Sequence, residues 1–313
     1  MIRVWFFGTP SLSERVLADC IQSEYIDVCY VVTNPDKPVG RSATLTPSPV
    51  KVTAEKHSLP VFTPQKIRGN EELFMTLRSY EVDYLVVVAY GKILPKEILE
   101  LPKKLPINIH GSILPKYRGA SPIQECLLQW ETVTGVTIME MSEWMDEGDI
   151  LSITPIAIDS DETSGTLFEK FAGVSGKALI DTLRLYESGN ITKEAQDNNN
   201  ATYCSKIEKE HGLIPWTSKT AKEIYHMWQG YNPWPGIYAF YQEKRILIEK
   251  CHYSLDTIGS TPIGSVVKKD GKIGVQCTEG ILFLETVKPE WKWSQEIATF
   301  VNGHKDFLNH IFP

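Results

Sequence analysis

DYLVVVAY (residues 83–90) and LPINIH (residues 105–110) are the two stretches of sequence that decide the fold of this chain. Both are mostly apolar without an alternating pattern, and helical patterns separate them from further apolar runs at residues 2–7 and 25–33. Strands that are apolar on both faces belong to a sheet that is covered on both sides. Strands that alternate with helices pair in parallel. The sequence therefore predicts an α/β domain with a Rossmann-like, mostly parallel sheet.

The second half of the sequence has a different pattern. A helix ends at Gly189-Asn190, and the polar stretch at residues 192–203 that follows predicts an exposed linker. A further helix is expected near residues 219–229. Short alternating segments then occupy residues 237–241, 244–252, 263–268, 272–277 and 280–287. Short strands joined by tight turns predict a small, OB-like β-barrel.

The length of 313 residues exceeds the usual size of a single domain. A hydrophobic fraction of 42% supplies enough apolar side chains for two cores. We therefore expect a catalytic domain at residues 1–189, a linker at 190–206 and a C-terminal β-barrel domain at 207–313.

Composition bounds the location and the partners of the protein. The six cysteines contain no CxxC pair, so we expect them to be reduced, as in cytosolic proteins. The N-terminus passes directly into a strand pattern, and the longest apolar run, at residues 84–90, is too short to span a bilayer. The sequence thus predicts a cytoplasmic protein. A net charge of −7 argues mildly against nucleic-acid binding, although the nearly neutral stretch from residue 206 onward keeps that option open.

A group of polar residues after the apolar runs points to the chemistry. Asn108 and His110 lie at the carboxyl end of a predicted strand, where parallel sheets bind their ligands. Because strand side chains alternate, these two residues lie on the same face. Asp146 follows a probable strand at residues 135–141, and it approaches His110 if that strand neighbours residues 106–110.

An amide, an imidazole and a carboxylate suit the transfer of a group between two bound substrates, with no covalent nucleophile and no metal. The carboxylate orients the imidazole and raises its basicity. The amide and a protonated imidazole donate to a developing oxyanion, which is worth roughly 3–4 kcal/mol per donor. Each residue also has a simpler interpretation, as a structural hydrogen-bonding group or a turn residue, and Arg118 as a partner of a surface carboxylate. The first strand–helix turn, FFGTPS, lacks the GxGxxG pattern, which argues against a nicotinamide enzyme.

Several stretches resemble a known family. The 10-formyltetrahydrofolate-dependent formyltransferases have a signature that is similar to NIHGSILPKYRGASPIQ (108–124), TGVTIMEM (134–141) and MDEGDIL (145–151). The branch of that family that formylates methionyl-initiator tRNA is similar in TNPDKPVGR (33–41), YCSKIEKEHGLIPW (203–216) and YNPWPGIYAF (231–240). The similar stretches span nearly the whole chain, in the same order.

The resemblance implies transfer of the formyl group of 10-formyltetrahydrofolate, a cosubstrate, to the α-amino group of methionyl-initiator tRNA, for initiation of translation and without a metal. It implies that Asn108, His110 and Asp146 are catalytic. His110 or a water held by His110 and Asp146 would accept the proton of the amine. The folate-binding residues that it implies are Ser112, Ile113, Leu114, Pro115, Val88, Tyr90, Gly91 and Ile93. The 141–146 loop would also wall the pterin pocket.

The tRNA contacts that the resemblance implies are Lys37, Arg41, Lys206, Lys209 and Arg245, with Lys244 as an alternative to Arg245. Two of them belong to a loop at residues 34–49, where the family carries more lysines and this chain has the neutral stretch Ser-Ala-Thr. Composition alone favours an ordinary surface loop there. We expect a monomer with no membrane partner.

Two other functions remain open at this point. The same chemistry can act on an amino-sugar nucleotide, as in related formyltransferases. The chain can also be a non-catalytic RNA-binding or folate-binding protein, although the complete set of Asn108, His110 and Asp146 argues against that.

Overall fold

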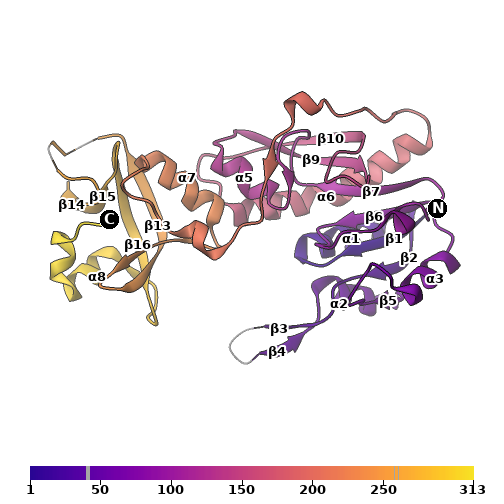
Figure 1. Cartoon of the computed structure of the whole chain (residues 1–313), viewed down its shortest axis with the longest axis horizontal. Helices are drawn as coiled ribbons and strands as arrows, with labels where there is room; N and C mark the ends of the chain where they lie inside the picture. The colour runs from indigo at the N-terminus through magenta and orange to yellow at the C-terminus, as the bar shows by residue number, and fades with distance from the viewer. Residues whose placement is uncertain (40–42, 257, 260) are drawn as a thin grey trace. The chain divides into compact units, whose positions relative to one another are not determined.

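A computed structural model of the chain describes residues 1–39, 43–256, 258–259 and 261–313 (Figure 1). The described residues form two compact units. Unit 1 consists of Met1–Pro122, Val133–Ile158 and Phe168–Cys204, and unit 2 consists of Ile123–Thr132, Asp159–Leu167 and Ser205–Pro313. Two short segments that precede residue 168 thus belong to unit 2, and the domain boundaries drawn from the sequence stay predictions. No helix in the described part of the chain is both long and apolar enough to cross a bilayer.

Unit 1 is built on a seven-stranded sheet in the order β10-β9-β7-β6-β1-β2-β5. Its strands are β1 (Ile2–Gly8), β2 (Ile26–Val32), β5 (Val61–Phe62), β6 (Tyr84–Val88), β7 (Leu105–His110), β9 (Val133–Glu140) and β10 (Ile150–Ala157). The five neighbouring strands β7, β6, β1, β2 and β5 pair in parallel, whereas β9 is antiparallel to both of its neighbours. The predicted mostly parallel sheet is confirmed.

Helices cover both faces of this sheet, as the continuous apolar strands require. Trp5 and Phe7 of β1 face a core that includes Leu73 and Leu77 of the helix α3. The helices of unit 1 are α1 (Ser11–Gln22), α2 (Pro49–Lys56), α3 (Glu71–Ser79), α4 (Lys96–Leu99) and most of α6 (Ser164–Glu187). The Ser13 side chain of α1 donates a hydrogen bond to the Val88 carbonyl at the end of β6, at 2.6 Å. This contact fixes α1 against the carboxyl end of the sheet.

The loop expected at residues 34–49 contains a small hairpin outside the main sheet. Its strands β3 (Lys37–Val39) and β4 (Thr44–Thr46) pair in antiparallel register, with Lys37 opposite Thr46. Figure 1 labels both strands beside α2. The hairpin gives an ordered base to a segment that its composition alone predicts as a loop.

Unit 2 contains a six-stranded antiparallel sheet in the order β12-β13-β16-β15-β14, with β17 paired to β16. Its elements are α5 (Pro122–Leu128, all but its first residue), α7 (Ala221–Tyr231), β12 (Ile237–Tyr241), β13 (Lys244–Ser254), β14 (Val266–Lys269), β15 (Lys272–Gln276), β16 (Ile281–Pro289), β17 (Gln295–Glu296) and α8 (Ile297–Gly303). The Thr220 side chain and Glu223 form a capping box that starts α7. The five predicted strand segments are all present, and α7 and α8 supply apolar side chains to the same core.

Residues 190–204 run along unit 1 and make specific contacts there. Glu194 forms a β-bridge with Ile150, and the short strand β11 (Tyr203–Cys204) pairs in parallel with β8 (Arg118–Gly119). A 3-10 turn, η1 (Asn198–Asn200), lies between these two contacts. We call residues 190–204 the strap. Although its surface is mostly exposed, its backbone is tied to the loop that follows β7 and to the start of β10.

Candidate active site

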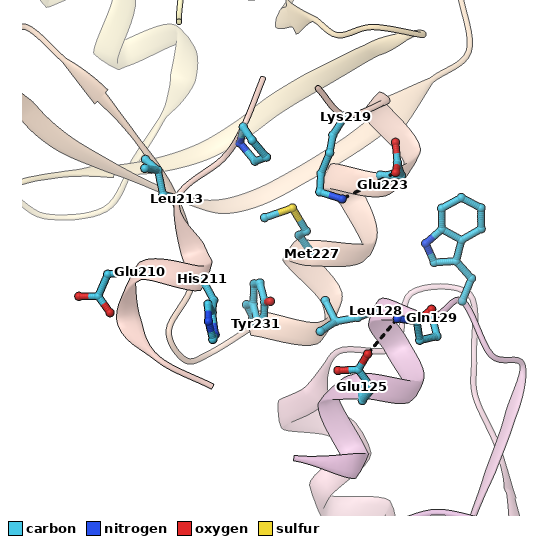
Figure 2. Close-up of a pocket in the computed structure, with 12 residues that line it drawn as sticks. Glu125, Leu128, Gln129, Glu210, His211, Leu213, Lys219, Glu223, Met227 and Tyr231 are labelled. Atoms are coloured by element: carbon cyan, nitrogen blue, oxygen red, sulfur yellow. Dashed lines mark hydrogen bonds and ion pairs between the residues drawn. The ribbon is translucent and has the colours of Figure 1, made fainter. Parts of the chain in front are cut away.

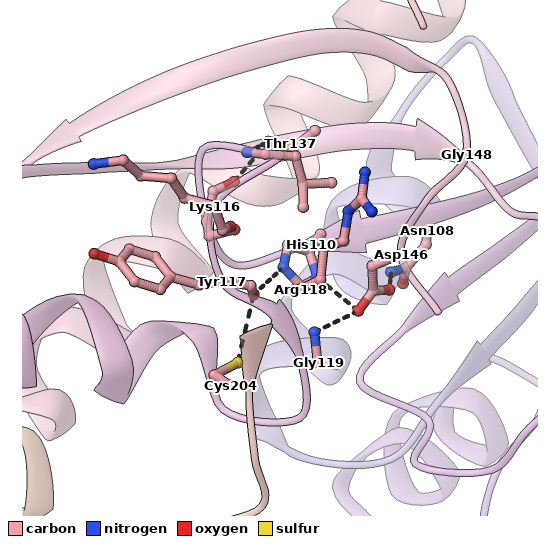
Figure 3. A network of polar contacts seen from close by, with 12 residues as sticks. Asn108, His110, Lys116, Tyr117, Arg118, Gly119, Thr137, Asp146, Gly148 and Cys204 are labelled. Atoms are coloured by element: carbon pink, nitrogen blue, oxygen red, sulfur yellow. Dashed lines mark hydrogen bonds and ion pairs between the residues drawn. The ribbon is translucent and has the colours of Figure 1, made fainter. Parts of the chain in front are cut away.

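The end of β7 and the loop after β9 bring the predicted catalytic residues together. β7 and β9 are antiparallel neighbours, with Asn108 opposite Met139 and His110 opposite Thr137. The condition set by the sequence, that these two strands lie side by side, is therefore confirmed. The chain leaves β9 and turns back toward β7, so that Asp146 reaches the face that carries Asn108 and His110 (Figure 3).

The Asp146 carboxylate is the centre of this group. Its Oδ1 accepts a hydrogen bond from the Asn108 amide at 3.4 Å, and its Oδ2 accepts one from the Gly119 backbone N–H at 2.8 Å. Nδ1 of His110 lies 3.7 Å from the same Oδ2. The His110 side chain is 4% exposed and that of Asp146 is 17% exposed, so the pair is largely shielded from water.

The hydrogen bond on the other side of the ring identifies the basic atom of His110. Nε2 lies 3.0 Å from the Tyr117 carbonyl oxygen, which can only accept a hydrogen bond. Nε2 therefore carries a hydrogen, and in the neutral ring Nδ1 is the atom with a free electron pair. That atom faces Asp146. The ring is thus oriented by a backbone carbonyl, whereas the sequence suggested the carboxylate for this role.

Burial sets the charge of the His110 ring. It lowers the pKa of His110 below its ordinary value of 6.5, although Asp146 and the Tyr117 carbonyl both raise it. The expected influence of Asp146 is present, but the loss of solvation outweighs it. At neutral pH the ring is uncharged and ready to accept a proton at Nδ1.

The loop after β7 is held in place by Thr137. The Thr137 hydroxyl donates to the Ser112 carbonyl at 2.6 Å and accepts from the Leu114 N–H at 3.3 Å. The Ser112 hydroxyl donates to the Lys116 carbonyl at 2.6 Å. Ser112 and Leu114 are buried, whereas Ile113 and Pro115 are partly exposed. The last two therefore offer side chains to a ligand, and the first two shape the loop.

The comparisons with known proteins agree along the whole chain. The sequence model of the family described as "Formyl transferase" matches residues 2–183, and that of "Formyl transferase, C-terminal domain" matches residues 206–305. A methionyl-tRNA formyltransferase of Caldicellulosiruptor saccharolyticus is 40% identical over 96% of both chains. One of Listeria innocua is 40% identical over 97% of this chain and 96% of its own.

The chain belongs to the methionyl-tRNA formyltransferase family.

The fold of this family member is also found in a more distant solved structure. An N-formyltransferase from Helicobacter canadensis, in complex with folinic acid and dTDP-3-aminofucose, superposes with a TM-score of 0.67. The alignment covers 91% of this chain and 99% of that protein, at 17% identity. At this identity the likeness shows the shared fold.

The remaining folate-binding residues expected from the resemblance fall into two groups. Val88 and Tyr90 are buried, and Tyr90 packs edge-on against Phe7 with 5.4 Å between ring centres. Gly91 and Ile93 are exposed at the carboxyl end of β6. Gly91 has a φ of +77° and open space where a Cβ would stand. A ligand at this edge can therefore reach the backbone around Gly91, while the two buried side chains belong to the core.

The residues expected to bind tRNA lie in both units. Lys37 is exposed on β3 in unit 1, and Arg41 lies outside the described residues. Lys206, Lys209 and Arg245 are exposed in unit 2. The Arg245 guanidinium lies over the Tyr238 ring, 5.3 Å from its centre.

Sequence reasoning missed the residues that support the candidate catalytic groups. They are the Tyr117 carbonyl, the Gly119 N–H, the Thr137 hydroxyl and the side chains of Arg118 and Gln196. Arg118 does pair with a partly exposed carboxylate, that of Glu147 at 3.4 Å, but it is itself 1% exposed and also binds Gln196. The sequence signal that could have identified Arg118 is its place in the Arg-Gly dipeptide, directly after the loop that follows His110. Backbone groups leave no such signal.

Unit 2 contains a cavity of about 700 Å³ between α5, α7 and the 3-10 turn η2 (Lys209–Gly212) (Figure 2). The polar groups that line it are engaged locally. Glu125 accepts from Gln129 at 2.9 Å, and Glu223 accepts from the Thr220 N–H at 2.7 Å. His211 accepts from the Glu208 N–H at 3.1 Å. Within the described residues, no group of three or more His, Cys, Asp or Glu side chains is arranged to hold a metal. The best catalytic candidate remains the group around Asp146.

Proposed function

We propose that this protein transfers the formyl group of 10-formyltetrahydrofolate to the α-amino group of methionyl-initiator tRNA. One observation carries the reaction type: a neutral His110 turns a basic Nδ1 toward the Asp146 carboxylate, beside the amide of Asn108. This arrangement moves a proton and stabilises an oxyanion without a covalent nucleophile. The acceptor is supported by the 40% identity to methionyl-tRNA formyltransferases, which extends through unit 2.

The reaction begins when the α-amine attacks the formyl carbon. A C–N bond forms, the formyl C=O becomes an oxyanion, and the nitrogen loses a proton to His110 Nδ1, directly or through one water. The resulting imidazolium lies 3.7 Å from the Asp146 carboxylate, which stabilises it. When the carbonyl forms again, the bond between the formyl carbon and the folate nitrogen breaks. The imidazolium returns its proton to that nitrogen, and the site regains its starting state.

Asn108 serves the oxyanion in this scheme. Its amide carries two hydrogens, of which one points toward Asp146 Oδ1 over a long 3.4 Å contact. The second hydrogen is available to the oxygen of the tetrahedral intermediate. Removal of one such donor lowers kcat by about 10²–10³-fold in comparable sites.

The folate is placed at the carboxyl edge of the sheet in unit 1. The support comes from the partly exposed Ile113 and Pro115, the exposed backbone around Gly91, and the loop that carries Asp146. The N-formyltransferase from Helicobacter canadensis, which shares this fold, is in complex with folinic acid. The pterin ring of the folate can take hydrogen bonds from exposed backbone groups here, since the side chains of Val88 and Tyr90 are buried in the core.

Exposed Lys206, Lys209 and Arg245 are proposed to contact the phosphates of the tRNA, as is Lys37 of the β3–β4 hairpin. Contacts of this kind release counterions, so binding weakens with salt. In Lys209→Ala, the slope of log affinity against log salt becomes about one unit less steep. An unchanged slope removes Lys209 from the proposed interface. The protein is further proposed to act in the cytoplasm as a monomer, and light scattering tests its mass in solution.

The decisive experiment offers purified protein 10-formyltetrahydrofolate together with methionine-charged initiator tRNA, and detects formylmethionine after hydrolysis of the ester. His110→Ala is expected to lower turnover by about 10²–10⁴-fold. His57→Ala is the matched control, because His57 is exposed at the end of α2. Formylation of an amino-sugar nucleotide in place of the tRNA would reverse the proposal. Binding of folate or RNA without transfer would replace it with a binding function.

A further inference from the structure

Gln196 links the strap to the loop that carries Asp146. Its Nε2 donates to the carbonyl oxygens of Asp146 and Gly148, at 2.8 and 2.7 Å. Its Oε1 accepts from Nε and Nη2 of Arg118, at 3.0 and 2.8 Å. An amide group offers two donor hydrogens and two acceptor positions. All four are used, so the side chain is fixed in a single orientation.

The Asp146 loop needs such a support. Asp146 has a φ of +54°, a left-handed backbone conformation that residues other than glycine seldom adopt. The two residues before it, Trp144 and Met145, are 72% and 63% exposed and contribute little packing. A strained residue persists only where the surroundings hold it. Gly119 holds the carboxylate of Asp146, and Gln196 holds its backbone.

Arg118 completes the support from a buried position. Its guanidinium, 1% exposed, also donates to Asn198 at 2.7 Å and pairs with Glu147 at 3.4 Å. The residues on either side of Arg118 bind two of the candidate catalytic side chains. The Tyr117 carbonyl accepts from the His110 ring, and the Gly119 N–H donates to Asp146 (Figure 3). One short segment thus anchors the base, the carboxylate and the glutamine.

We propose that Gln196 is a positioning residue that sets the distance between the Asp146 carboxylate and Nδ1 of His110, with Arg118 holding its amide in register. This inference rests on the proposed formyl transfer. It assigns the strap, which composition predicts as a linker, a direct part in the geometry of the reaction. Gln196 acts through Asp146 and contacts none of the reacting atoms.

Gln196→Glu separates positioning from folding. The new side chain has the same shape and keeps an oxygen for Arg118, where the added charge strengthens the pair. It places a second oxygen against the carbonyls of Asp146 and Gly148, which cannot donate to it. We expect kcat for formyl transfer to fall by about 10–100-fold, because an error of about 1 Å in the reacting geometry costs on the order of 10²-fold. The thermal midpoint is expected to stay close to that of the wild type.

The second measurement follows the His110 ring by NMR while the pH is varied, in the neutral variant Gln196→Met. Asp146 raises the pKa of His110, so a displaced carboxylate lowers that pKa further. Lys193→Ala is the control. It removes another contact of the strap, the pair between Lys193 and Glu140 at 2.6 Å, and it leaves Asp146 untouched.

The inference is overturned if Gln196→Glu retains wild-type kcat, or if the His110 titration in Gln196→Met matches that of the wild type. An effect of equal size in Lys193→Ala overturns it as well, because a general loosening of the strap then explains both. If the wild-type protein transfers no formyl group, the proposed function fails. The titration still decides whether Gln196 positions Asp146.

Discussion

Replacement of Asp146 by asparagine tests the electrostatic part of the site. The substitution keeps the shape of the side chain. It also keeps an oxygen that can accept a hydrogen bond from the Gly119 N–H, which lies 2.8 Å from Oδ2 of Asp146 in the wild type. It removes the charge that faces Nδ1 of His110 across 3.7 Å. The change therefore removes the attraction between the carboxylate and the imidazolium that forms when His110 takes up a proton, together with the long contact that Oδ1 accepts from the Asn108 amide.

The size of this attraction follows from the distance. Two unit charges about 4 Å apart interact by about 4 kcal/mol at an effective dielectric constant of 20. Partial exposure of Asp146 reduces the value, and opposite charges at such distances shift a pKa by about 1–3 units. Since one unit corresponds to about 1.4 kcal/mol, formation of the imidazolium becomes roughly 1.4–4 kcal/mol less favourable. Turnover is expected to fall by about tenfold to thousandfold.

Formyl transfer to methionyl-tRNA and NMR titration of the His110 ring measure the two consequences independently. In Asp146→Asn the pKa of the ring moves further below its ordinary value, and kcat falls at every pH above it. Asp149→Asn makes the same change within the same loop and is expected to leave both quantities unchanged. A ring that titrates as in the wild type refutes the assigned role of Asp146, whatever happens to the rate.

Two further predictions concern the loop and the stability of the fold. A Cβ at Gly148 collides with the Glu140 carbonyl, so Gly148→Ala is expected to lower the free energy of unfolding by about 1–3 kcal/mol and to lower kcat. Gly173 lies in open space on α6, so Gly173→Ala is expected to raise the free energy of unfolding by about 0.5–1 kcal/mol. Equal midpoints of the two variants in chemical denaturation contradict the packing argument. Burial lowers the pKa of His110 and of His226, so both take up protons on unfolding once the pH falls below about 6.5. The free energy of unfolding is therefore expected to decrease as the pH falls through that value, and less steeply in His110→Gln; a midpoint in urea that is independent of pH there contradicts it.

The order of strands and helices was predictable from periodicity. The apolar runs at 83–90 and 105–110 became the neighbouring strands β6 and β7, and the five short segments of the second half became β12 to β16. These features are local, because the spacing of apolar residues along the chain already encodes which side of a strand or helix is buried. The β3–β4 hairpin escaped prediction, since each strand has only three residues and all three residues of β4 are exposed.

That the three candidate catalytic residues lie together was predictable, but the groups that support them were not. Asn108 and His110 stand on one strand, and their motif places Asp146 in the loop after the next antiparallel strand. The residue that holds the Asp146 backbone comes from the strap, 50 positions further along the chain. Nothing in the polar composition of that stretch distinguishes Gln196 from its neighbours. Its role depends on which groups surround it after folding.

The sequence by itself determined the family and the element order, and it predicted the three candidate catalytic side chains, because each of these is encoded in periodicity or in short sequence motifs. The tertiary structure alone decided which nitrogen of His110 is basic and in which direction its pKa moves. It also decided that Val88 and Tyr90 belong to the core and that residues 190–204 support the site. These properties follow from burial and from hydrogen-bond partners that lie far apart in the chain. Such partners meet only when the chain has folded.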